Sequence, residues 1–90
     1  MAQIIATPKD MRIFAQDLER LSAELKDKQR RMEDELQRLG VSWQDDRYRR
    51  FSRAVTTASV QFVAFHNRAK SFVEFLGRKA AAGERYLSRG

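Results

Sequence analysis

The sequence predicts an all-α fold, an antiparallel hairpin of two long helices that dimerises into a four-helix bundle. Three observations lead to this prediction. Apolar residues recur every three or four positions along two long segments. Each segment opens with residues that commonly cap helices, and one short break around Gly40 separates the two segments. Because a short loop holds consecutive helices side by side, the 90-residue chain is expected to form a single hairpin domain.

The first predicted helix covers about residues 8–39. Thr7 can act as its N-cap, and Pro8 suits the first helical position. Its apolar stripe consists of Met11, Phe14, Leu18, Leu21 and Leu25, followed by Met32, Leu36 and Leu39. Lys28 and Gln29 interrupt this stripe. They predict a polar layer of the kind that sets the register between helices at some cost in stability.

The predicted turn spans residues 40–43. We expect Gly40 to end the first helix, because glycine adopts the left-handed capping conformation without strain. We expect Ser42 to cap the second helix, with Asp45 three residues later completing a capping box. Trp43 allows two interpretations, a plug that covers the end of the hairpin or a surface that contacts a partner. The turn motif is therefore Gly40, Ser42, Trp43 and Asp45.

The second predicted helix covers about residues 43–77, and a flexible tail is expected over 78–90. The apolar positions of this helix alternate steps of three and four without a fault. They are Tyr48, Phe51, Val55, Ala58, Phe62, Phe65, Ala69, Phe72 and Leu76. This regularity is the strongest signal in the sequence. It favours packed core over a lipid or cofactor pocket for the aromatic residues.

A hairpin of two helices cannot surround its own core, so part of its apolar surface remains open to water. On a helical wheel, Val60, Val63 and Phe75 lie outside the main stripe of the second helix. The apolar surface of the second helix is therefore wider than its main stripe. Two interpretations are compatible with this width: scattered surface residues, or a second hairpin packed alongside. The second interpretation underlies the predicted bundle. The expected core and dimer-seam residues are Phe14, Leu18, Leu21, Leu25, Phe51, Val55, Phe62, Phe65 and Phe72.

The composition excludes several functional classes. The chain has no Cys, which excludes a disulfide scaffold and a thiol enzyme. Its single histidine, His66, has no His or Glu neighbour at metal-binding spacing, so we predict no metal, cofactor or catalytic residue. The longest nearly apolar stretch, residues 60–65, is too short to span a membrane. Residues 1–10 lack the pattern of a secretory signal peptide.

The net charge of +6 is compatible with an anionic partner. Basic residues on the first helix have acidic neighbours at helical spacing, which favours a solvated face. The second helix opens with a basic cluster that has few such neighbours, Arg47, Arg49, Arg50 and Arg53. This cluster could bind an acidic protein, a membrane surface or nucleic acid. The aromatic residues follow the core period rather than interleaving with the arginines, which disfavours nucleic acid.

A tryptophan in a tight turn between two long helices resembles the WXG family of small type VII secretion proteins, the ESAT-like proteins. The residues that carry this resemblance are 39–43, which read Leu-Gly-Val-Ser-Trp, and the aromatic residues Tyr48 and Phe51. Members of that family are helical hairpins of about this length, which pair as homodimers or heterodimers. In this chain Asp45 stands at the family's glycine, so W-x-G reads W-Q-D.

The resemblance implies a non-enzymatic function. It implies a secreted substrate, targeting partner or chaperone of a type VII-like secretion system, cytoplasmic before export and secreted without a cleavable signal peptide. The implied partners are a second copy or a related hairpin, a secretion ATPase and cargo. The family's Y-x-x-x-D/E export signal is not matched, since Gly90 stands four positions after Tyr86. The residues leave two alternatives open, a basic nucleic-acid-binding protein and a coiled-coil adaptor for another helical protein.

Overall fold

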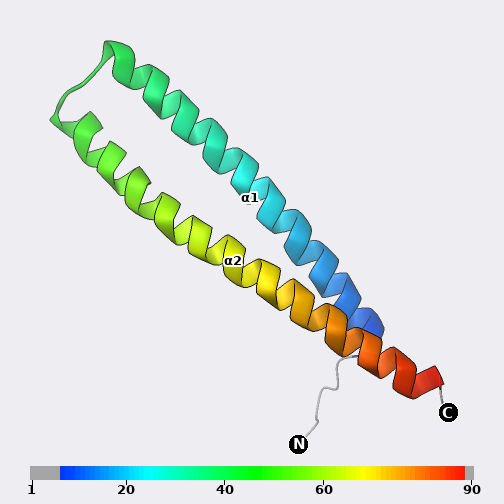
Figure 1. Ribbon diagram of the computed structural model, residues 1–90. Helices are drawn as coiled ribbons and strands as arrows, with labels where there is room; N and C mark the ends of the chain where they lie inside the picture. Colours follow the sequence, from blue (N-terminus) through cyan, green and yellow to red (C-terminus); the bar gives the residue numbers. More distant parts are fainter. Residues whose placement is uncertain (1–6, 89–90) are drawn as a thin grey trace, which may run out of the picture.

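The computed structural model describes residues 7–88, which form two helices, α1 (Pro8–Ser42) and α2 (Asp46–Ser88). The helices run antiparallel and are joined by residues 43–45, which produces an elongated hairpin of 67 × 27 × 16 Å (Figure 1). No strand occurs among residues 7–88. The prediction of an all-α helical hairpin is therefore confirmed.

The start of α1 follows the capping pattern of the sequence. The Thr7 hydroxyl accepts a hydrogen bond from the backbone N–H of Asp10 at 3.1 Å. The Thr7 carbonyl accepts another from the N–H of Met11 at 3.0 Å. Pro8, which has no N–H to satisfy, occupies the first helical position. The orphan donors of the first turn are thus partly satisfied without any tertiary partner.

The end of α1 differs from the prediction, because the helix continues through Ser42 and Gly40 lies inside its last turns. No glycine in residues 7–88 has a positive φ, so Gly40 is not a left-handed cap. Glycine at this position instead lets a side chain of α2 approach the α1 backbone closely. Gly40 is buried, and a Cβ placed there would lie 2.5 Å from Cζ of Tyr48, whose ring covers it.

The start of α2 also differs, because Asp45 rather than Ser42 is its N-cap. The Asp45 carboxylate accepts a hydrogen bond from the N–H of Tyr48 at 2.8 Å, and the Asp45 carbonyl accepts from Arg49 at 3.0 Å. The Ser42 hydroxyl donates back to the carbonyl of Leu39 at 3.5 Å, within the last turn of α1. A carboxylate at this end of α2 also interacts favourably with the helix dipole. The turn consequently comprises residues 43–45 and lies later in the chain than the predicted turn at 40–43.

The far end of α2 extends through most of the segment for which a flexible tail was expected, residues 78–90. Gly83 does not interrupt it. A Cβ at Gly83 would lie 2.8 Å from Cγ of Pro8, so glycine permits the two helices to approach at this end. Figure 1 shows the two ribbons spread at the turn and crossing near this opposite end. Gly90, which stands where the family's export signal would have an acidic residue, lies outside the described residues.

The contact between the helices is a narrow seam of residues three or four positions apart. We use seam for the buried and half-buried rows that comprise Met11, Ala15, Leu18, Ser22, Leu25, Gln29, Glu33, Leu36 and Gly40 of α1, and Tyr48, Ser52, Val55, Ser59, Phe62, His66, Ala69, Val73, Leu76 and Ala80 of α2. Among residues 7–88, the only buried hydrophobic side chains are Val55, Ala69, Leu76 and Ala80. Most of these are small, so the hairpin alone has a thin core.

Candidate interaction surface

Most of the large apolar side chains lie beside the seam rather than in it. Because the helices are antiparallel, residues that immediately precede a seam position lie on the same side of the hairpin in both helices. We call this side the apolar face. Its eight large side chains are Phe14, Leu21, Met32 and Leu39 of α1, and Phe51, Phe65, Phe72 and Phe75 of α2. Each is between 38% and 56% exposed.

Aromatic contacts connect the two helices across the apolar face. The rings of Phe14 and Phe72 meet edge to face with centroids 6.1 Å apart. Phe75 stacks on Phe72 with centroids 6.0 Å apart. Farther along, Phe65 lines a shallow groove together with Leu25, Ala58, Gln61 and Phe62. The face therefore carries aromatic side chains over much of its length, held by neighbours but still largely exposed to solvent.

The single apolar stripe predicted for each helix is divided into two rows in the structure. Of the expected core and dimer-seam residues, four lie in the seam between the helices: Leu18, Leu25, Val55 and Phe62. The other five lie on the apolar face: Phe14, Leu21, Phe51, Phe65 and Phe72. The role of these residues in a dimer stays a prediction.

A row of small and polar residues explains this division. Within the seam, small residues recur seven positions apart on each helix. They are Ala15 and Ser22 on α1, and Ser52 and Ser59 on α2. These side chains let the helices approach closely, and the approach leaves the bulkier neighbouring row outside. The row of serines at seven-residue spacing is the sequence signal that could have identified the seam.

Polar layers interrupt the seam at two levels. The Ser22 hydroxyl and Nδ1 of His66 are 2.6 Å apart, which places His66 inside the seam. Nearer the turn, Glu33 accepts hydrogen bonds from the Ser59 hydroxyl and from Nε2 of Gln29, the latter at 3.0 Å. These two bonds, the Ser59 bond first, lower the pKa of Glu33 from its ordinary value.

The predicted polar layer at Lys28 and Gln29 is only half present. Gln29 lies in the seam, whereas Lys28 is exposed. Glu33 supplies the second polar group of this layer instead. The layer coincides with two successive steps of four residues along the α1 half of the seam, from Leu25 to Gln29 and on to Glu33. Because the usual alternation of three and four is broken here, the second polar residue of the layer is Glu33, one turn after Gln29, and not the predicted Lys28.

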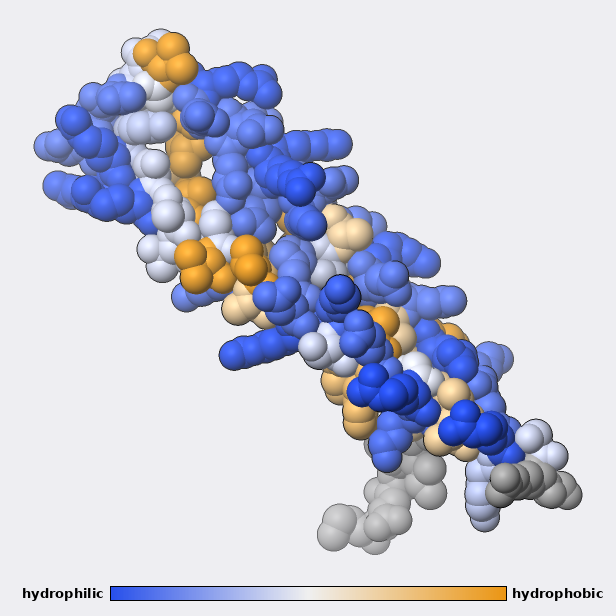
Figure 2. Space-filling view, in the orientation of Figure 1, coloured by the Kyte–Doolittle hydropathy of each residue, from blue (hydrophilic) through white to orange (hydrophobic). Residues whose placement is uncertain are grey.

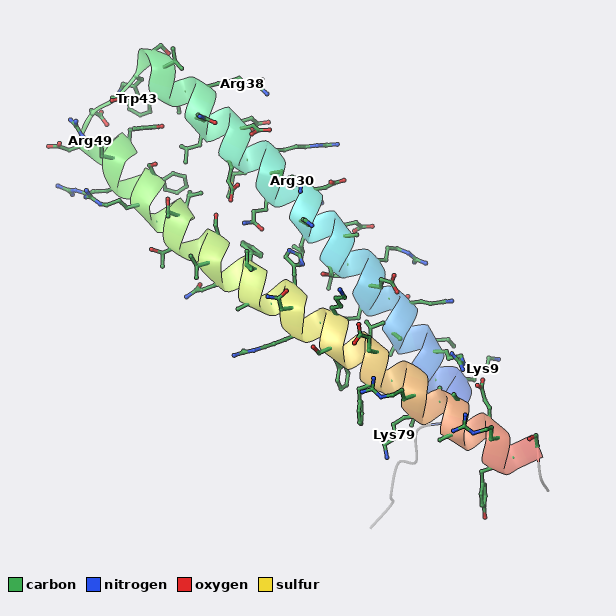
Figure 3. The ribbon with its side chains drawn as sticks, viewed as in Figure 1. Lys9, Arg30, Arg38, Trp43, Arg49 and Lys79 are labelled. Atoms are coloured by element: carbon green, nitrogen blue, oxygen red, sulfur yellow. The ribbon has the colours of Figure 1, made fainter. Side chains whose placement is uncertain are left out.

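The turn is closed by Tyr48 rather than by Trp43. The Tyr48 ring packs over Gly40, and its hydroxyl donates a hydrogen bond to the carbonyl of Leu36 at 3.2 Å. Trp43 lies at the end of the hairpin and is 48% exposed (Figure 3). Tyr48 thus largely provides the plug that one interpretation of the sequence assigns to Trp43. Contact between Trp43 and a partner stays a prediction.

The basic cluster at the start of α2 does not form one surface. Arg47 precedes a seam position and lies toward the apolar face, whereas Arg49 and Arg53 follow seam positions and lie on the opposite side. Arg49 also forms an ion pair with Asp46, with 3.6 Å between nitrogen and oxygen. Arg50 points away from α1, between these two sides. A flat anionic ligand could not meet all four guanidinium groups at once.

The side opposite the apolar face is more polar, although Val41, Val60 and Val63 are exposed there. Figure 2 shows a face on which hydrophilic side chains dominate and hydrophobic atoms form only small patches. Arg12 donates two hydrogen bonds to the Glu84 carboxylate, at 2.5 and 2.9 Å, across the open end of the hairpin. This pairing lowers the pKa of Glu84. The two sides of the hairpin therefore differ in chemistry, and only the apolar face combines large aromatic residues from both helices.

Two further findings bear on the class of protein. Neither helix is long and apolar enough, over residues 7–88, to cross a membrane. In the same part of the chain, no three His, Asp or Glu side chains are grouped so that they could hold a metal ion. The fold and the apolar face define an α-helical hairpin with one exposed hydrophobic surface. No family model, curated protein or solved structure matches the chain.

Proposed function

We propose that this chain is a non-enzymatic interaction protein that acts as a dimer. In this proposal the apolar face packs against the same kind of face on a second helical hairpin, and a four-helix bundle results. The observation that carries the proposal is the apolar face itself. Eight large side chains, five of them Phe, line one side of the hairpin and are all substantially exposed. Apolar patches of this kind commonly mark protein–protein interaction sites.

The surface area of the chain supports this proposal. The accessible surface is 7879 Å². A compact monomer of this mass has about 5,400 Å². A standard interface buries about 800 Å² on each partner, so one face of the hairpin provides enough area. Full burial of one Phe side chain stabilises a structure by about 1.5–3 kcal/mol. Pairing that buries several of these Phe side chains therefore adds stabilisation that the hairpin alone does not gain.

We further propose that the dimer is WXG-like and acts as a substrate, targeting partner or chaperone of a type VII-like secretion system. The two-helix architecture and the tryptophan at the turn support this role. The half-exposed indole of Trp43 is available to a secretion ATPase or to cargo. The partner hairpin is a second copy or a related protein. The chain is then cytoplasmic before export and leaves the cell without a cleavable signal peptide.

An export assay tests this role. The full chain, carrying an epitope tag, is expressed in a bacterium with a type VII-like system, with and without its ATPase, and the tag is quantified in the medium. We expect ATPase-dependent export that Trp43→Ala reduces and the matched variant Val41→Ala, at an 87% exposed neighbour, does not. A chain that dimerises but is never exported contradicts the secretion role. That result would favour the adaptor alternative.

A further inference from the structure

The two edges of the apolar face carry opposite charge. We use edge residues for the charged residues that immediately precede a seam position and so lie on the apolar face, among its large side chains. On α1 they are Asp10, Asp17, Glu24 and Glu35, with Lys28 as the one basic exception. On α2 they are Arg47, Arg68 and Lys79, with no acidic residue. The α1 edge is therefore mainly acidic and the α2 edge is basic.

This separation exists because the two helices differ in charge. Helix α1 contains eight Lys or Arg and eight Asp or Glu residues, whereas α2 contains nine and three. Four of the acidic residues of α1 are edge residues. Of the basic residues of α2, Arg50, Arg53, Arg78 and Arg85 are not edge residues. The excess positive charge thus lies mostly away from the apolar face, and the face itself presents both signs.

We propose that the partner of the apolar face is a second copy of this chain, oriented so that both turns lie at the same end of the bundle. This inference rests on the proposed function, because it specifies the partner and the geometry of the proposed dimer. A rotation of 180° about the long axis of the bundle places α1 of each copy against α2 of the other. The acidic edge of each copy then meets the basic edge of its partner on both sides.

The heights of the residues along the hairpin agree with this pairing. Rotation about the long axis does not change the position of a residue along that axis. Each α1 residue therefore faces, in the second copy, the α2 residues that lie level with it in its own hairpin. Phe14 lies at the level of Phe72, and Ser22 lies at the level of His66. Asp17 is therefore at the level of Arg68 of the second copy. The aromatic cluster around Phe14 meets the same cluster of the second copy.

Acidic and basic edge residues also meet at the open end of the bundle. Pro8 lies against Gly83 in the hairpin, which puts Asp10 near the level of Lys79. Each of these pairs occurs twice in a symmetric dimer. Opposite charges facing each other across an interface fix its orientation and register more than they add affinity.

The alternative with the turns at opposite ends brings like charges together. A rotation about an axis across the hairpin places α1 against α1 and α2 against α2. The edge that holds Asp17 and Glu24 then faces its own copy, and the edge that holds Arg68 faces another basic edge. Juxtaposed like charges disfavour an arrangement even when its apolar contacts are equivalent. The charge pattern thus discriminates between two dimers that hydrophobicity alone would allow.

A distance measurement between spin labels tests the orientation. The chain contains no Cys, so Val41→Cys in the full chain gives a single labelling site at the turn. With both turns at one end, the two labels of a dimer lie about 20–30 Å apart, which is roughly the width of a bundle with helices spaced 8–10 Å. With turns at opposite ends, the separation is close to the helix length, about 50 Å. Ser88→Cys gives the same readout at the other end.

Charge reversal provides an independent readout with a matched control. We expect Arg68→Glu to raise the dimer dissociation constant about tenfold, and Asp17→Lys to restore it in the double variant. Lys70→Glu makes the same charge change on the polar side and should leave dimerisation unchanged. A dimer with label separations near 50 Å overturns this inference and leaves the proposed function standing. A monomer that is fully helical at every concentration overturns the proposed function itself, because the apolar face then needs no partner, whereas a poorly helical monomer overturns only the second copy as the partner.

Discussion

The rings of Phe14 and Phe72 meet edge to face 6.1 Å apart, yet the two residues remain 53% and 45% exposed. The pair spans both helices, so the hairpin positions these rings but does not remove them from water. Each aromatic residue realises only part of the stabilisation that full burial would give. A partner surface that covers the apolar face supplies the remainder. This relationship between two phenylalanines is the physical basis of the proposed dimer.

Phe72→Asp should dissociate the dimer. A carboxylate at the centre of an apolar interface loses hydration without gaining a partner, and loss of a buried Phe costs about 3–5 kcal/mol. Light scattering should therefore give the monomer mass at concentrations at which the unaltered chain is dimeric. Circular dichroism should show reduced helicity, because the seam alone is thin.

Val60→Asp is the matched control for that experiment. Val60 is 68% exposed and follows a seam position, so it lies on the side opposite the apolar face. We expect this variant to keep the mass and helicity of the unaltered chain. If both variants behave alike, the apolar face is not the dimer interface.

Gly40→Ala should destabilise the hairpin by about 1–2 kcal/mol, although alanine favours helices. The added Cβ overlaps the Tyr48 ring and forces it away, which breaks the hydrogen bond from Tyr48 to Leu36. Gly77→Ala is the control, because a Cβ there has no atom within 4 Å. It should stabilise the chain by about 0.5–1 kcal/mol. Thermal unfolding of both variants measures the contrast, and a Gly40 variant as stable as the Gly77 variant refutes the close-approach account.

The Ser22–His66 layer should show strong coupling in a double-mutant cycle. Nε2 of His66 is buried without a hydrogen-bond partner among residues 7–88, and its Nδ1 depends on Ser22. Ser22→Ala should therefore cost about 1–3 kcal/mol, since it leaves a second polar atom unsatisfied. Replacing both residues, by Ser22→Ala and His66→Leu, should be close to neutral or stabilising. Denaturant unfolding of the four proteins measures the coupling, and simple additivity would argue against a hydrogen-bonded pair.

Acid should weaken the hairpin through Glu33. The hydrogen bonds from Ser59 and Gln29 lower the pKa of Glu33 in the folded chain below its unfolded value. The corresponding stabilisation is present above the ordinary Glu pKa of 4.5 and is lost as the pH falls through this value to the lower folded pKa. Melting temperature should decline over this range.

Ser59→Ala isolates the contribution of the Glu33 site. The variant removes the main cause of the lowered pKa, so its melting temperature should depend less on pH between neutrality and pH 3 or so. Ser52→Ala, seven residues earlier in the same row of the seam, should retain the full dependence. Equal pH dependence in both variants would show that the Ser59 bond does not hold Glu33 ionised.

Much of this fold could be predicted from the sequence because its helices depend on local signals. The caps at Thr7 and the unbroken apolar period of α2 act within a few residues, and both helices form where these signals place them. These local signals gave a wrong prediction where contact between the two helices determines the structure. Gly40 resembles a helix terminus in the sequence, but the Tyr48 ring that packs over it makes glycine necessary within the helix.

The division of the apolar stripe could not be predicted from hydrophobicity alone. Phe62 and Phe65 are equally apolar and belong to the same stripe, yet one lies in the seam and the other on the apolar face. The difference depends on Ser59 and His66, whose modest size and polar contacts with Glu33 and Ser22 of α1 select which side of the stripe meets α1. Only the packed pair of helices shows which residues are left for a partner.

The most direct test of the central claim is the mass of the purified full chain in solution. Light scattering over a range of concentrations, with circular dichroism on the same samples, reports assembly and helicity together. A helical species of twice 10.5 kDa, which loses helicity as it dissociates on dilution, is the predicted result. A fully helical monomer of 10.5 kDa at every concentration would contradict the account, because the apolar face would then need no partner.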